Sequence, residues 1–261
     1  MANTERLNQI LADPDANLDV LLAALASVDQ SAPPEHEVVQ AFDLLAESAQ
    51  RQTSSPTVPQ TLDFVFGHLG FSGNATDYYD PANSLIHDVL RHRRGIPITL
   101  AAVASEIGRR LGNRLRPVGL PGHVLLAADA EPGRWYDPFN RGAILNHQDC
   151  VNLFGRFHPV AAFEPWMLDA MNNETFAVRT LNNLRVAFGR SGRLTDLVPV
   201  LELRANLAIS GADDRVDFAN LLGNVGRFDQ AADEFELLIE LDPDHAEEHQ
   251  AKARSYRAHR N

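Results

Sequence analysis

The stretch that decides the fold covers residues 83–140 and reads NSLIHDVLRHRRGIPITLAAVASEIGRRLGNRLRPVGLPGHVLLAADAEPGRWYDPFN. A helix is predicted from Pro97 to Leu111, because proline is favoured in a first helical turn and Gly112 is a typical C-terminal stop. Strand patterns follow at residues 115–120, 123–128, 134–139 and 143–145. Pro132-Gly133 forms a turn between the second and third of these. We therefore expect antiparallel strands with a helix packed on one face.

Two polar residues are predicted to meet on this sheet. If the turn lies between Asp129 and Gly133, Leu125 pairs with Asp137, and His123 projects from the same face as Asp137. A carboxylate in that position can fix the tautomer of an imidazole and stabilise its protonated form, which is the role of the third member of a catalytic triad. A structural hydrogen bond that joins two strands is the alternative reading of the same pair.

The chain divides into three regions. Residues 1–72 show helical periodicity, residues 73–165 contain the helix and the strands, and residues 166–261 contain an internal repeat. In the middle region, Asn83 is expected to cap a helix with apolar residues at positions 85, 86, 89 and 90. In the last region, Ser191-Gly192-Arg193-Leu194 and Val225-Gly226-Arg227-Phe228 are 34 residues apart, which is the period of tetratricopeptide repeats.

Charge and composition argue against several classes of protein. The net charge is −12, and residues 1–70 carry ten acidic and two basic side chains, whereas a nucleic-acid-binding protein needs clustered Lys and Arg. No apolar window approaches the roughly 18 residues of a membrane span, and the N-terminal residues do not resemble a secretory leader. We therefore expect a cytoplasmic protein that binds neither nucleic acid nor membrane.

Cofactor and metal sites are also not expected. Cys150 is the only cysteine, which leaves no intrachain disulfide and no thiolate cluster, and we expect it to be a buried structural thiol. His87 and His92 are five residues apart and do not share a helix face, while His245 and His249 favour a solvated helix surface. No Gly-rich phosphate loop is present.

Residues 83–150 resemble the transglutaminase-like core of the SirB-type family, which is often followed by tetratricopeptide repeats. The resemblance is carried by Asn83-Ser84, residues 94–101 (RGIPITLA), Arg110-Leu111-Gly112, Pro121-Gly122-His123 and Asp137-Pro138-Phe139. It implies an α+β fold with a transglutaminase- or papain-like core, in which helices pack on a small antiparallel sheet. It also implies an N-terminal helical region and C-terminal tetratricopeptide-like hairpins.

The same resemblance implies a triad of Cys, His and Asp, of which only His123 and Asp137 are present. The position of the nucleophile falls on Pro97, which offers neither a nucleophile nor an amide hydrogen. Thr99 follows two residues later, and its ordinary role would be a hydrogen bond to the helix backbone. We expect a non-catalytic module that binds a protein or peptide through a groove with His123 and Asp137, in which Arg94 and Asn83 also take part. A hydrolase or acyl transferase that uses Thr99 or a water activated by His123, and a structural relic whose function lies only in the repeats, remain alternatives.

Overall fold

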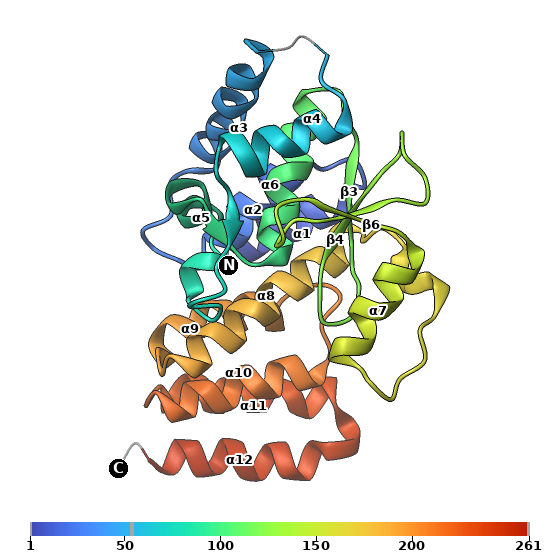
Figure 1. Cartoon of the computed structure of the whole chain (residues 1–261). Helices are drawn as coiled ribbons and strands as arrows, with labels where there is room; N and C mark the ends of the chain where they lie inside the picture. The colour runs from blue at the N-terminus through green and yellow to red at the C-terminus, as the bar shows by residue number, and fades with distance from the viewer. Residues whose placement is uncertain (1, 53–54, 260–261) are drawn as a thin grey trace.

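Helix α6 (Pro97–Arg110) occupies the centre of the α+β fold in the computed structural model, which describes residues 2–52 and 55–259 (Figure 1). Pro97 is the first helical residue, as predicted, and the helix ends one residue earlier than expected. The helix is buried along most of its length because its small side chains allow close packing. At Gly108, a Cβ atom would lie only 2.8 Å from the Asn113 carbonyl oxygen and 3.0 Å from Leu115 Cδ1.

A four-stranded antiparallel sheet of order β3-β4-β5-β6 packs against α6. The strands are β3 (Leu115–Val118), β4 (Leu125–Ala128), β5 (Trp135–Asp137) and β6 (Ala143–Leu145). Leu126 pairs with Tyr136 and Ala127 with Trp135, which confirms the predicted register. The first three strands are shorter than predicted. In particular, His123 lies in the turn before β4 and not on the strand, because the chain reverses at Gly122 with φ +82°.

The two faces of the sheet contact different hydrophobic clusters. Leu126 and Ala128 join the main core with α6, whereas Leu125 joins a smaller cluster with Cys150 and Phe154 of helix α7 (His147–Phe157). Alternate residues of one strand thus point to α6 and to α7, as expected for a pleated strand buried on both sides. The sheet is the middle layer between these two helices.

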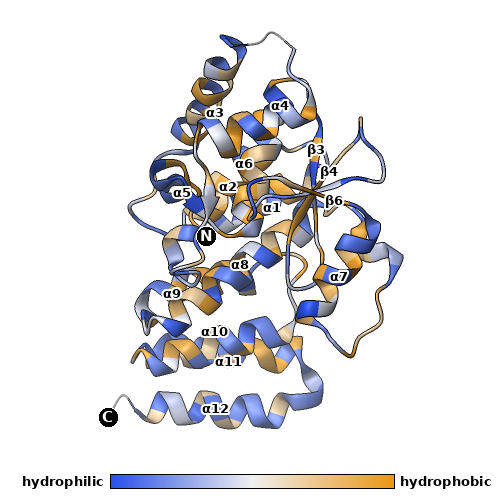
Figure 2. Cartoon of the chain, viewed as in Figure 1, coloured by the Kyte–Doolittle hydropathy of each residue, from blue (hydrophilic) through white to orange (hydrophobic). Residues whose placement is uncertain are grey.

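The N-terminal helices cover the other side of α6. They are α1 (Ala2–Ala12), α2 (Leu18–Ala26), α3 (Glu35–Gln50) and α4 (Val58–Asp63), and a π-helical turn, η1 (Phe64–His68), follows α4. Two short parallel strands, β1 (Ser72–Gly73) and β2 (Arg94–Gly95), pair beside the N-terminus of α6. The helices α2 and α6 are among the more hydrophobic parts of the chain in Figure 2, which agrees with their central position.

Asn83 is not the helix cap that the sequence predicted. It ends the 3₁₀ turn η2 (Pro81–Asn83), and helix α5 (Ile86–His92) begins later, with Leu85 as its N-cap. The Asn83 side-chain amide instead donates to the carbonyl oxygens of Asp77, at 2.7 Å, and Tyr78, at 3.2 Å. The asparagine is therefore used to hold the preceding loop, which leaves it unable to cap α5.

The C-terminal helices pack in sequence order, each against the next, toward the bottom of the view in Figure 1. A 3₁₀ turn, η3 (Pro165–Leu168), precedes them, and another, η4 (Pro243–His245), precedes the last helix. The helices are α8 (Asn173–Arg190), α9 (Leu194–Ala205), α10 (Ala212–Asn224), α11 (Phe228–Leu241) and α12 (Ala246–Ala258). Gly192 and Gly226, 34 residues apart, have φ of 68° and 79° at equivalent turns, a conformation that glycine adopts without strain. Within the described residues, no helix combines the length and the apolar character that a membrane crossing requires.

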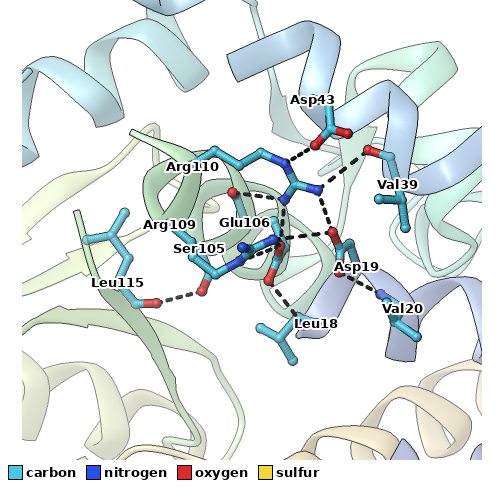
Figure 3. A network of polar contacts seen from close by, with 10 residues as sticks. All are labelled: Leu18, Asp19, Val20, Val39, Asp43, Ser105, Glu106, Arg109, Arg110 and Leu115. Atoms are coloured by element: carbon cyan, nitrogen blue, oxygen red, sulfur yellow. Dashed lines mark hydrogen bonds and ion pairs between the residues drawn. The ribbon is translucent and has the colours of Figure 1, made fainter. Parts of the chain in front are cut away.

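A network of buried charges joins the N-terminal helices to the C-terminal end of α6 (Figure 3). Arg110 binds Asp19 at 2.5 Å, Glu106 at 2.7 Å and Asp43 at 2.6 Å, and Arg109 binds Glu106 at 2.8 Å. Asp19 and Glu106 are 1% and 2% exposed, so neither carboxylate can be solvated by bulk water. Burial raises the pKa of Glu106, and the two arginines and the N–H of Leu18 compensate its charge.

We predict that Asp19→Ala lowers the free energy of unfolding by about 1.5–3 kcal/mol, because Arg110 loses its charged hydrogen bond to this buried carboxylate while it keeps Glu106 and Asp43. Urea denaturation measures the change. The control is Arg6→Ala, which removes an ion pair with Glu35 whose partners are 48% and 36% exposed. This control should change stability by no more than about 1 kcal/mol. Equal effects of the two substitutions would show that the network is not a major source of stability.

Candidate functional site

His123 and Asp137 form a buried pair at the end of the sheet where β4 begins and β5 ends. His123 Nε2 lies 2.9 Å from Asp137 Oδ1, and the two residues are 8% and 3% exposed. The meeting of His123 and Asp137 that the strand register predicts is therefore confirmed, although His123 lies before the strand and not on it. Because an ionised carboxylate only accepts hydrogen bonds, Nε2 carries the proton of a neutral imidazole and Nδ1 is left as its basic nitrogen.

The Asp137 carboxylate is held by three further donors. Its Oδ1 accepts from the backbone N–H groups of Phe139, at 3.0 Å, and Asn140, at 3.2 Å, and its Oδ2 accepts from the Asn140 side chain at 2.6 Å. Burial opposes ionisation, but the hydrogen bond and charge of His123 and the donors of Asn140 outweigh it. The pKa of Asp137 therefore lies below its ordinary value, and the group is a carboxylate at neutral pH.

Aromatic rings fix the plane of the imidazole. The Phe157 ring stacks on His123 with centroids 6.1 Å apart, and Phe139 meets it edge-on at 6.3 Å. A Cβ atom at Gly122 would lie 2.7 Å from Phe157, and one at Gly73 would lie 2.5 Å from Phe139. Glycine at these two positions allows the two rings to approach His123 closely.

Arg179 of α8 is a site residue that the sequence did not reveal. Its guanidinium donates to the carbonyl oxygens of Leu120, at 3.1 Å, and His123, at 2.9 Å. It thereby holds both ends of the turn that presents the imidazole, and burial lowers its pKa. Nothing in the sequence near residue 179 distinguishes it from a surface arginine, because its partners lie more than fifty residues earlier in the chain.

Thr99 and Pro97 are placed in the first turn of α6. The Thr99 hydroxyl lies 2.7 Å from the Asn83 carbonyl oxygen and 3.1 Å from that of Ile96, and it accepts from the Ile96 N–H at 3.2 Å. Both Pro97 and Thr99 are buried. Among the residues that the structure describes, no hydrogen bond links Thr99 to His123. The hydroxyl thus serves the helix terminus, the ordinary role considered for it.

The other two predicted binding residues have different surroundings. Arg94 is exposed on β2, and in the described part of the chain no hydrogen bond or ion pair connects its side chain to His123 or Asp137. Asn83 is buried and reaches the first turn of α6 through its carbonyl oxygen, which accepts from Thr99. The structure therefore joins Asn83 to Thr99 and His123 to Asp137, but not the two pairs to each other by hydrogen bonds.

Cys150 is fully buried on α7, as expected. Burial raises the pKa of its thiol to about 12, and the nearby charge of Asp149 adds to this effect. The thiolate is the reactive form of cysteine, so this residue is unreactive at neutral pH.

The chain matches a family model over a range that includes α6, the sheet and the His123–Asp137 pair. Residues 36–182 match the model of the transglutaminase-like superfamily, and the chain belongs to that superfamily. The match extends on both sides of residues 73–165, and thus includes α3, α4 and much of α8 with Arg179.

Related proteins occur in bacteria and in mammals. A UPF0162 protein of Xylella fastidiosa is 36% identical over 138 residues, which are 50% of this chain and 48% of the relative. A UPF0162 protein of Vibrio cholerae is 32% identical over 136 residues, or 51% of this chain and 50% of the relative. The F-box only protein 21 of Mus musculus is 32% identical over 146 residues, 51% of this chain and 22% of that protein. The chain thus spans about half the length of these bacterial relatives, and no solved structure matches it.

We predict that Asp137→Asn reduces stability at neutral pH and that the deficit shrinks in acid. The pKa of Asp137 is lower in the folded than in the unfolded chain, so its contribution is fully present above the unfolded pKa of about 3.9 and is lost as pH falls through the folded pKa. Urea denaturation of both proteins between about pH 6 and about pH 3 measures the difference. A deficit that stays constant over this interval would show that the charge of Asp137 contributes nothing to the fold.

Proposed function

We propose that this chain is a non-catalytic transglutaminase-like module that binds a protein or peptide beside the His123–Asp137 pair. The observation that carries the proposal is the identity and bonding of the side chains in the first turn of α6. Pro97 stands where the superfamily resemblance puts the nucleophile, and the Thr99 hydroxyl is engaged by backbone groups at 2.7–3.2 Å. The imidazole is thus oriented and held, but the side chain that it would activate is replaced.

Exposed aromatic side chains next to the pair support binding. Phe157 is 49% exposed while it stacks on His123, and Tyr78 is 36% exposed while its ring meets Phe139 edge-on. Tyr79 is 44% exposed, and the Arg190 guanidinium lies 4.0 Å from the centre of its ring. Aromatic and arginine side chains are enriched where proteins bind one another. These residues form the surface that we assign to the partner, and we call it the aromatic rim (Tyr78, Tyr79, Phe157 and Arg190).

The C-terminal helices favour the same class of function. Helices α8 to α11 form two hairpins whose turns repeat at the 34-residue period of tetratricopeptide repeats, and we assign them to that class. Such stacked hairpins offer extended surfaces for protein binding. The shared domain accounts for about half of the bacterial relatives and about a fifth of the mouse protein, which is consistent with a module that operates in different proteins. We also propose a cytoplasmic location, on the sequence arguments given above.

We predict that peptides selected from a random display library on the intact protein lose affinity when the rim or the imidazole is removed. His123→Ala and Phe157→Ala should each weaken binding by about thirtyfold, which corresponds to the roughly 2 kcal/mol lost on truncating a hot-spot residue. Fluorescence anisotropy with a labelled peptide measures the affinity. The control is Leu44→Ala, which alters a side chain that is 57% exposed on α3. Peptides that bind the unaltered protein and the three variants with equal affinity would exclude this surface as the binding site.

The enzymatic alternative makes a contrasting prediction. We expect no turnover of acyl esters or peptide amides that depends on His123, because the Thr99 hydroxyl is committed to the Asn83 and Ile96 backbone. Thr99→Val and His123→Ala are compared with the unaltered protein, and the melting temperature of each is measured in parallel. Hydrolysis that disappears in His123→Ala without a fall in melting temperature would establish catalysis and overturn the proposal.

A further inference from the structure

Three potential ligands converge away from the His123–Asp137 pair. His87 and Asp88 lie in the first turn of α5, and Asp29 lies in the loop that follows α2. His87 Nε2 is 3.4 Å from Asp29 Oδ2 and 3.7 Å from Asp88 Oδ2, and one ligand atom from each residue lies within 4.8 Å of the others. Spacing within α5 alone did not reveal this group, because Asp29 comes from a distant part of the chain.

The unsatisfied ring nitrogens of His87 favour a cation bound by the group. The His87 side chain is 6% exposed, and neither of its ring nitrogens has a hydrogen-bond partner of good geometry. Buried polar groups in native proteins are nearly always satisfied, since an unsatisfied one costs the full desolvation penalty. The 3.4 Å approach to Asp29 is an ion-pair distance without the alignment of a hydrogen bond. A bound cation between the three residues would satisfy Nε2.

The separations of His87 from the two carboxylates match the requirements of zinc, and the ligand atoms of all three residues lie within 4.8 Å of one another. Zinc–nitrogen and zinc–oxygen bonds of about 2.0–2.2 Å at tetrahedral angles separate neighbouring ligand atoms by about 3.3–3.5 Å. The observed separations of 3.4 and 3.7 Å are within a few tenths of an ångström of this value. Imidazole with carboxylates is a ligand set suited to zinc, whereas calcium and magnesium prefer oxygen ligands only. Two carboxylates would also balance the charge of a divalent ion.

The surroundings orient both carboxylates. His92, one turn after Asp88, has its Nε2 3.7 Å from Asp88 Oδ1, while Asp88 Oδ2 is the oxygen near His87. Asp29 Oδ1 accepts from the Ser31 backbone N–H at 2.8 Å and from the Ser31 hydroxyl at 2.9 Å. These two bonds direct Oδ2 toward His87, in the way that outer hydrogen bonds orient metal ligands.

We propose that Asp29, His87 and Asp88 form a zinc site, with a water molecule in the fourth position. The ion would tie the loop after α2 to the start of α5, which leads through Arg93 to β2 and to the first turn of α6. It would act as a clamp between these two segments, since its protein ligands come from both of them.

The test is zinc titration of the purified protein, stripped of metal and without a polyhistidine tag, by isothermal titration calorimetry. Asp29→Asn and Asp88→Asn remove ligand charge while preserving shape, so they are preferred to substitutions of the buried His87. The matched control is Asp242→Asn, in the second cluster of histidines and a carboxylate. There Asp242 already bonds His245 at 3.0 Å and His249 at 3.0 Å. Cobalt absorption and melting temperature with and without zinc are recorded for each protein.

We expect one zinc ion per chain, a higher melting temperature with zinc, and a cobalt spectrum that reports nitrogen and oxygen ligands. Asp29→Asn and Asp88→Asn should each weaken zinc binding by at least about tenfold, the smallest effect seen even for outer partners of metal ligands. Asp242→Asn should bind zinc like the unaltered protein. No stoichiometric binding, or binding that persists in both asparagine variants, would overturn the proposal, as would binding that only Asp242→Asn removes.

Discussion

The network that Arg109 and Arg110 form around the buried carboxylates of Asp19 and Glu106 is the constraint on which the remaining structure depends. It connects α2 and α3 to the end of α6, and the opposite end of α6 carries Pro97 and Thr99. The Asp19 and Glu106 carboxylates are 1% and 2% exposed and tolerate only one arrangement, because each must keep an arginine partner to offset its desolvation. The network therefore fixes the axial position of α6 relative to the N-terminal helices, and with it the first turn beside the candidate site.

Local patterns in the sequence were sufficient for the centre of the fold. Pro97, Gly112 and the Pro132-Gly133 turn defined the helix and the strand pair, and the turn set the register that brings His123 to Asp137. The pattern was less reliable at element ends. The strand was predicted to begin at His123, but the positive φ of Gly122 delays it, and Asn83 holds a loop where a helix cap was expected.

Contacts between segments that are far apart in the chain could not be predicted from the sequence. Arg179 reaches Leu120 and His123 from another helix, and Asp29 meets His87 across two elements. Each of these residues is unremarkable within its own segment, since its role depends on where the partner segment packs. The same holds for Thr99: its type suggested either a nucleophile or a backbone ligand, and only the position of the Asn83 carbonyl oxygen distinguishes them.

The position of Arg179 has a mechanical consequence for the imidazole. The turn that carries His123 is bonded on one side to the sheet, through Asp137, and on the other to the first of the stacked C-terminal helices. The ring is thus held between the sheet and α8, which share one hydrophobic core, since Leu181 of α8 belongs to the same buried cluster as Leu126 and Tyr136 of the sheet. Because Arg179 bonds two carbonyl groups of that turn, the place of α8 in the fold also sets the place of the histidine.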